Sequence, residues 1–145
     1  MPTINFSVSA KSENPTKVVA KTGAGFEIIV DEPENLGGTN DGASPVDYVL
    51  AALSGCLNVV GHLVAKQMGF EIRGLSIDIS GELDPARFMG KSDEERAGYQ
   101  AINVQIDVDC DADQAVLDEW IEAVESRCPV SDNLANETPV NISVK

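Results

Sequence analysis

The sequence has little that could bind nucleic acid or hold a metal ion. Of its 145 residues only 10 are Lys or Arg, against 24 Asp or Glu, so the formal net charge is −14 at pH 7. A surface of that sign repels phosphate backbones and anionic membranes, which excludes nucleic acid and membrane surfaces as partners. The chain has one histidine and no C-x-x-C pair. A zinc site is therefore not expected.

The sequence also lacks the signals of export and membrane insertion. No basic stretch followed by an apolar run opens it, so we expect no signal peptide. The longest apolar region, 48–65, is interrupted by polar residues and glycines, and we do not expect it to cross a membrane. Three cysteines, an odd number, argue against a structural disulfide framework. We expect one cytoplasmic domain, residues 1–145, whose cysteines are buried hydrophobes, metal ligands or redox thiols.

Period-two alternation of apolar and polar residues predicts several strands. The turn Gly23-Ala24-Gly25 separates two of them and suggests a hairpin. A polar stretch, 84–98, separates two others and is expected to be a loop or a short helix. The predicted strands lie at 4–8, 17–20, 26–30, 72–83, 99–110 and 140–144.

Two helices are predicted between these strands. The first spans 45–68: Ser44 can cap it, Pro45 suits its first position and Gly69 ends it. The second begins after Asp111 or Asp113 and ends before Pro129. Its apolar face, at helical spacing, consists of Val116, Leu117, Trp120, Ile121 and Val124. Strands and helices cluster rather than alternate, which favours an α+β fold with mainly antiparallel sheet.

Two cysteines occupy different helical settings. Cys56 falls within the long helix, among apolar neighbours three and four residues away, and its first interpretation is a buried, inert side chain. Cys128 precedes Pro129 and would cap a new short helix, where backbone N–H groups and the adjacent Arg127 lower a thiol pKa. For Cys128, a reactive thiol and a mere helix break are equally consistent with the sequence. Cys110 lies between two aspartates and is interpreted as structural.

Two segments resemble the OsmC-like family, which includes osmotically inducible protein C and the organic hydroperoxide resistance proteins. The first is the run 37–45 followed by 50–56, which reads LAALSGC, and the second is 128–134, CPVSDNL, followed by Pro139-Val140. The order of elements agrees along nearly the whole chain. The resemblance implies antiparallel sheets around a long central helix that carries Cys56, and an intertwined homodimer with its sites at the subunit interface.

The resemblance also implies a chemistry. Cys56 would be the peroxidatic thiolate that reduces organic hydroperoxides, and Cys128 would resolve its sulfenic acid as a disulfide. An external dithiol would regenerate the pair, with no cofactor. The alternatives at the same cysteines are a non-enzymatic dimeric module that binds a small apolar ligand, and other thiol chemistry such as a persulfide or acyl carrier.

The sequence departs from the peroxidase branches of that family at two positions. Those branches use an Arg on an early strand and a Glu just after the helix-starting proline. Here Val46 follows Pro45, and no Arg precedes Arg73. The chain therefore resembles a divergent branch. A cation that activates Cys56 would have to come from another residue, and the candidates are Lys21, Lys17 and Arg127.

Overall fold

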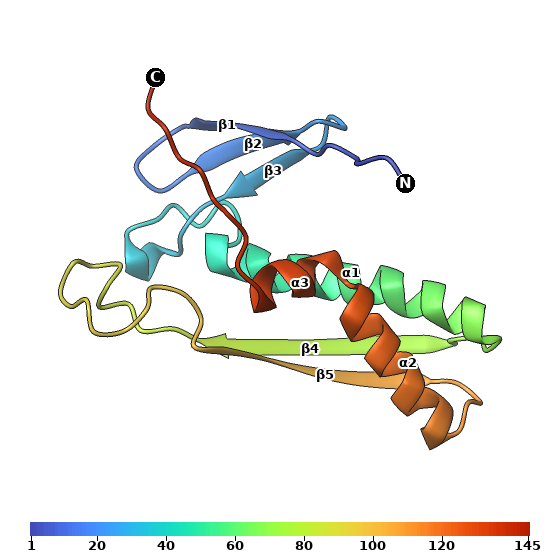
Figure 1. Ribbon diagram of the computed structural model, residues 1–145. Coiled ribbons are helices and arrows are strands. Elements are labelled where there is room, and N and C mark those ends of the chain that lie inside the picture. The colour runs from blue at the N-terminus through green and yellow to red at the C-terminus, as the bar shows by residue number, and fades with distance from the viewer. The chain divides into compact units, whose positions relative to one another are not determined.

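The computed structural model describes residues 1–145, which form two compact units, 1–49 and 50–145. The first unit is an antiparallel sheet of three strands in chain order, β1 (Val8–Ser12), β2 (Val18–Thr22) and β3 (Glu27–Val30) (Figure 1). Pairing of β2 with β3 confirms the predicted hairpin, and Gly25 in its turn has a φ of 95°. A short 3-10 turn, η1 (Glu34–Leu36), follows the sheet.

A buried carboxylate organises the loop that leaves this sheet. Asp31 is fully buried and accepts hydrogen bonds from the hydroxyls of Thr16 and Thr39. It also accepts from the amides of Glu32 and Asp41. These hydrogen bonds hold the pKa of Asp31 well below its usual range, and the bond from Thr39 has the largest effect. Burial acts in the opposite direction and raises the pKa, but it does not outweigh the bonds. The carboxylate therefore stays ionised and ties the loop to the sheet.

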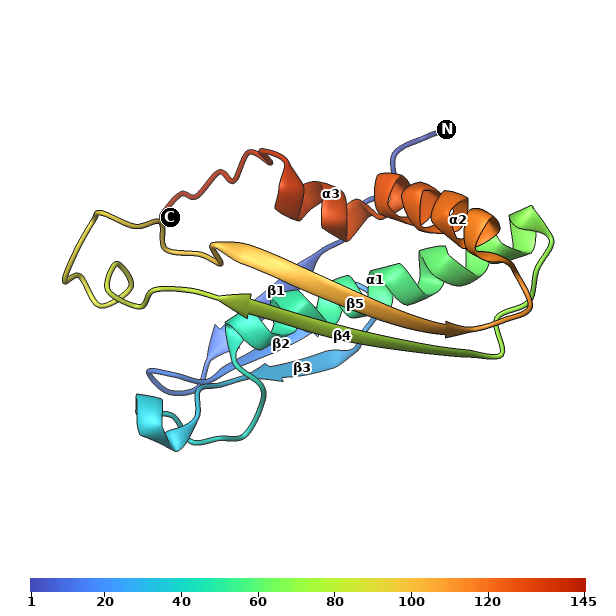
Figure 2. The same cartoon turned by 90° about the horizontal axis from the view of Figure 1, so that it is seen from below.

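The second unit holds most of helix α1 (Pro45–Met68), the hairpin of β4 (Gly74–Glu82) and β5 (Ala101–Asp109), and helices α2 (Gln114–Arg127) and α3 (Pro129–Ala135). The strands pair antiparallel along their full length, from Gly74 opposite Asp109 to Glu82 opposite Ala101. In Figures 1 and 2, α1 runs along one face of this hairpin and α2 packs beside it. The expected α+β architecture with antiparallel sheet is confirmed.

The predicted helix boundaries are confirmed by their caps. Ser44 and Asp47 exchange hydrogen bonds at the start of α1, and Gly69 ends the helix with a φ of 84°. Of the two aspartates proposed to cap the next helix, Asp113 accepts from the Val116 amide. The stretch 84–98 forms turns and no helix.

Two predicted strands at the ends of the chain are wrong. Residues 4–7 form no strand: the Ser7 carbonyl accepts a hydrogen bond from the Gly23 amide, but regular pairing with β2 begins only at Val8. Residues 140–144 alternate as a strand does but lack a partner, since alternation alone supplies no hydrogen bonds. Their apolar side chains stay exposed: Val140 by 79%, Ile142 by 88% and Val144 by 97%.

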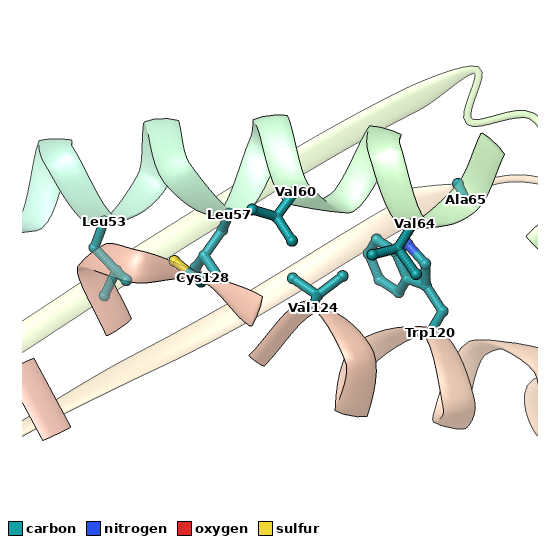
Figure 3. Packing of buried hydrophobic residues seen from close by; sticks show 8 residues of the cluster. All are labelled: Leu53, Leu57, Val60, Val64, Ala65, Trp120, Val124 and Cys128. Carbon is teal, nitrogen blue, oxygen red and sulfur yellow. The ribbon is translucent and has the colours of Figure 1, made fainter. Parts of the chain in front are cut away.

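The core of the second unit lies between α1, α2 and the hairpin (Figure 3). Leucines and valines spaced three and four residues apart on α1 meet residues of α2 and Cys128. The partly buried strand residues Ile77 and Ile106 close the core from the side of the hairpin. The buried residues are Leu53, Leu57, Val60, Val64, Ala65, Trp120, Val124 and Cys128.

We expect Leu57→Ala to lower the free energy of unfolding by about 2–5 kcal/mol, because it leaves a cavity beneath α1. Ile121→Ala is the matched control, since Ile121 lies on α2 outside this cluster and is 36% exposed. Ile121→Ala should lower the free energy of unfolding by less than half as much as Leu57→Ala. Urea denaturation followed by circular dichroism measures both, and equal losses would contradict the assignment of the core.

Candidate functional site

Helix α1 places Cys56 at the border between its buried and exposed faces. Leu53 and Leu57, three residues before and one after it, are buried in the core. Val59 and Leu63, three and seven residues after it, are 65% and 47% exposed. Cys56 itself is half-buried. Its thiol therefore belongs to the core on one side and to an exposed apolar stripe on the other.

The junction of α2 and α3 places Cys128 in the core. Helix α2 ends at Arg127, and Pro129 takes the first position of α3, as the sequence predicts. Cys128 is the cap between them, and its Sγ accepts a hydrogen bond from the Ser131 amide at 3.4 Å. The side chain is fully buried and lies among α1 side chains in Figure 3.

The two sulfurs lie next to each other. Sγ of Cys128 is 2.8 Å from Sγ of Cys56, although the residues are 72 positions apart in the chain. A disulfide bond has a length of about 2.05 Å, so closing the remaining gap requires a shift of less than about 1 Å. The fold thus brings together the two thiols singled out in the sequence.

The surroundings of Cys56 favour its neutral form. Burial raises the pKa of the Cys56 thiol, and the hydrogen bond with Cys128 raises it further. The amide of Val130 donates to the Cys56 sulfur and acts in the opposite direction, but burial dominates. The thiol needs a nearby positive charge to ionise readily near neutral pH.

The three candidate cations have different partners. Lys17 pairs with Asp41 at 2.9 Å and with Glu13 at 3.1 Å. The Arg127 guanidinium donates to Gln67, which lies eleven residues beyond Cys56 on α1. At 1.5 Å per residue, that is about 16 Å further along the helix.

Lys21, on β2, forms no ion pair, although Glu27 stands opposite it on β3. Cys110 lies at the far end of β5, half-buried, between two aspartates that both pair with Arg73. No cluster of three or more His, Cys, Asp or Glu residues is placed to hold a metal ion.

The indole of Trp120 links α2, which ends next to Cys128, to α1, which carries Cys56. Trp120 of α2 donates from its Nε1 to the carbonyl of Gly61 on α1 at 2.8 Å, and its ring packs edge-on to Phe70. A Cβ on Gly61 would lie 3.1 Å from that ring, so the glycine permits the close approach. The sequence indicates that Trp120 faces the core but gives no sign of its partner on α1.

Solved structures with this fold come from several bacteria. An OsmC-like protein from Mycoplasma pneumoniae superposes with a TM-score of 0.78 at 20% identity, over 91% of this chain and 88% of that one. An organic hydroperoxide resistance protein OsmC from Legionella pneumophila gives 0.68 at 15% identity, over 92% and 91%. One from Elizabethkingia anophelis gives 0.64 at 20% identity, over 90% and 88%. At these identities the likeness establishes the fold.

The sequence defines the family more narrowly. Residues 38–143 match the profile of the OsmC-like proteins, and no protein with a curated description matches the chain. The chain belongs to the OsmC-like family. Proteins of this family are soluble. By length and composition α1 could cross a membrane, but the core helix of a soluble protein passes the same test, and α1 packs in the core here.

We expect the contact between the sulfurs to direct oxidation to one pair. Diamide should lower the count of free thiols from three to one and join the peptides that carry Cys56 and Cys128. Cys110→Ser should leave this cross-link intact, because Cys110 is not at the contact. Thiol titration and peptide mass mapping under denaturing conditions measure the outcome. A dominant cross-link to Cys110 would contradict the geometry.

Proposed function

We propose that this protein reduces organic hydroperoxides through the Cys56–Cys128 pair, as part of a defence against oxidative stress. The observation that carries the proposal is the 2.8 Å separation of the two sulfurs. Membership of the OsmC-like family supports it, since similar structures from Legionella pneumophila and Elizabethkingia anophelis are named organic hydroperoxide resistance proteins.

The half-buried thiol is the attacking group. The thiolate of Cys56 attacks one peroxide oxygen, the O–O bond breaks, and the organic fragment leaves as an alcohol after protonation. Cys56 becomes a sulfenic acid. The Cys128 sulfur, already in contact, then attacks the Cys56 sulfur, water leaves, and a disulfide forms. An external dithiol returns both cysteines to thiols by exchange, without a cofactor.

The exposed stripe on α1 fits an apolar substrate. Ala52, Val59 and Leu63 share one flank of the helix with Cys56, and all three are exposed. A hydrocarbon group that covers them loses contact with water, which favours binding. Alkyl and aryl hydroperoxides should therefore react better than hydrogen peroxide.

The attacking thiol requires a cation, and the candidates from the sequence are Lys21, Lys17 and Arg127. Lys17 and Arg127 already have partners, whereas Lys21 forms no ion pair. An ammonium group near Cys56 stabilises the thiolate and lowers the thiol pKa, opposing the effect of burial.

The protein acts as a homodimer in this proposal. The alternating apolar side chains at both ends of the chain are uncovered, among them Phe6 at 88% and Ile142 at 88% exposed. Extended segments of this kind bury their apolar faces and pair their backbones by joining a sheet. A second copy offers the matching segments, as expected for the intertwined dimer of this family.

A different observation favours a second function, the binding of a small apolar ligand without chemistry. The pKa of Cys56 is raised, and no cation contributes to its environment. A neutral thiol beside an apolar stripe forms an uncharged surface that a hydrocarbon ligand can contact. Binding of an apolar probe by the reduced wild-type protein, together with no consumption of hydroperoxide, would favour this function.

The peroxidase function is tested by rapid mixing of the reduced protein with one equivalent of cumene hydroperoxide. We expect two thiols to be lost per chain and one cumyl alcohol to form. Cys56→Ser should abolish the reaction, whereas Cys128→Ser should stop at a sulfenic acid that dimedone traps. If the wild type loses neither thiol, the proposed function is wrong.

Lys21→Ala should reduce the rate of peroxide consumption at pH 7 by at least about tenfold, which corresponds to one pKa unit at Cys56. Because loss of the ammonium raises the thiol pKa, the rate should recover as the pH rises. Lys21→Arg should keep the wild-type pH profile. Lys11→Ala on β1 is the control, since Lys11 is also exposed and forms no ion pair. An unchanged pH profile in Lys21→Ala would exclude Lys21.

A further inference from the structure

We infer that an external thiol re-reduces the oxidised pair by attacking the sulfur of Cys56 and not that of Cys128. This inference rests on the proposed redox function of the pair and adds the route by which the reductant enters. It concerns which sulfur of a disulfide receives the incoming thiolate and which one leaves, a choice that depends on access and on the leaving group.

Access differs sharply between the two sulfurs. Cys128 has 0% of its surface exposed and belongs to the buried cluster that includes Leu53, Leu57 and Val124. Figure 3 shows its sulfur between the helix it caps and the leucines of α1. Cys56 is half-buried and lies at the edge of the exposed stripe. A thiolate must approach along the line of the breaking S–S bond, and of the two sulfurs only that of Cys56 belongs to a residue with exposed surface.

Oxidation does not alter this difference. Closing the 2.8 Å gap to a bond needs less than about 1 Å of movement, which does not bring Cys128 out of the core. A second copy of the chain cannot expose Cys128 either, since an added surface only covers more of the molecule. A peroxide that reaches Cys56, as the proposed function requires, has used a path that remains available to a thiol.

The neighbouring amides do not reverse the choice. Ser131 donates to the Cys128 sulfur and Val130 donates to the Cys56 sulfur, so each sulfur has one backbone donor. Either thiolate would be stabilised as it left. Access therefore decides which sulfur is attacked.

The exchange balances in two steps. The thiolate of a dithiol gives an electron pair to Cys56 and forms a mixed disulfide, while the Cys56–Cys128 bond breaks and its pair stays on Cys128, which takes up a proton. The second thiolate of the dithiol then attacks the dithiol's first sulfur, which is bonded to Cys56 in the mixed disulfide. Cys56 leaves as a thiolate, and the dithiol becomes a disulfide. The dithiol loses two electrons and the protein gains two. A monothiol in limited supply stops after the first step.

The test starts from Cys110→Ser protein oxidised with diamide, so that the disulfide forms without any peroxide reaction. A brief exposure to 2-mercaptoethanol is stopped with acid, and the new thiols are labelled with N-ethylmaleimide in guanidinium chloride. Peptide mass mapping then locates both adducts. We expect mercaptoethanol on Cys56 and maleimide on Cys128 in at least tenfold excess over the reverse arrangement.

The same reaction carried out in guanidinium chloride is the control. Both sulfurs are then accessible, and the two arrangements should form in comparable amounts. Equal or greater mercaptoethanol labelling of Cys128 in the folded protein would overturn the inference, and so would a failure of diamide to join the two cysteines. Selective attack at Cys56 in a protein that consumes no hydroperoxide would uphold the inference while refuting the proposed function.

Discussion

The packing of α1 against the α2–α3 junction is the interaction on which the rest of the second unit depends. It buries the apolar face of α1, fixes the Trp120 indole on the Gly61 carbonyl and brings two sulfurs to 2.8 Å. All three features depend on one distance, the separation between α1 and the α2–α3 junction. The thiol contact is therefore a product of the core, and a change that loosens the core should also separate the thiols.

The same burial that brings the thiols together opposes their ionisation. An apolar environment raises the pKa of Cys56, so proximity favours the second step of a peroxidase while it hinders the first. A nearby positive charge resolves this conflict. No Arg precedes Arg73 in the sequence, so the proposed activity depends on a cation from another residue. The balance between burial and that charge determines whether the site reacts with peroxide or only binds apolar molecules.

Elements that depend on local interactions could be predicted from the sequence. Ser44, Asp113 and Gly69 mark helix ends through hydrogen bonds or a backbone angle within a few residues of themselves. The strands predicted at 4–8 and 140–144 are wrong, because a strand exists only where a partner provides its hydrogen bonds, which residue alternation does not reveal. Residue patterns alone suggested that Cys56 was inert. Its contact with Cys128 spans 72 positions, which no local pattern encodes, and the pairing was expected only through the resemblance to the OsmC-like family.

The most direct test of this account compares the stability of the reduced and diamide-oxidised proteins in guanidinium chloride. If the thiols lie in contact in the native fold, the disulfide restricts only the unfolded chain and should raise the free energy of unfolding by about 2–4 kcal/mol. The Cys110→Ser background restricts the cross-link to the pair. Equal or lower stability of the oxidised protein would mean that the bond strains the fold, and it would contradict the contact between Cys56 and Cys128.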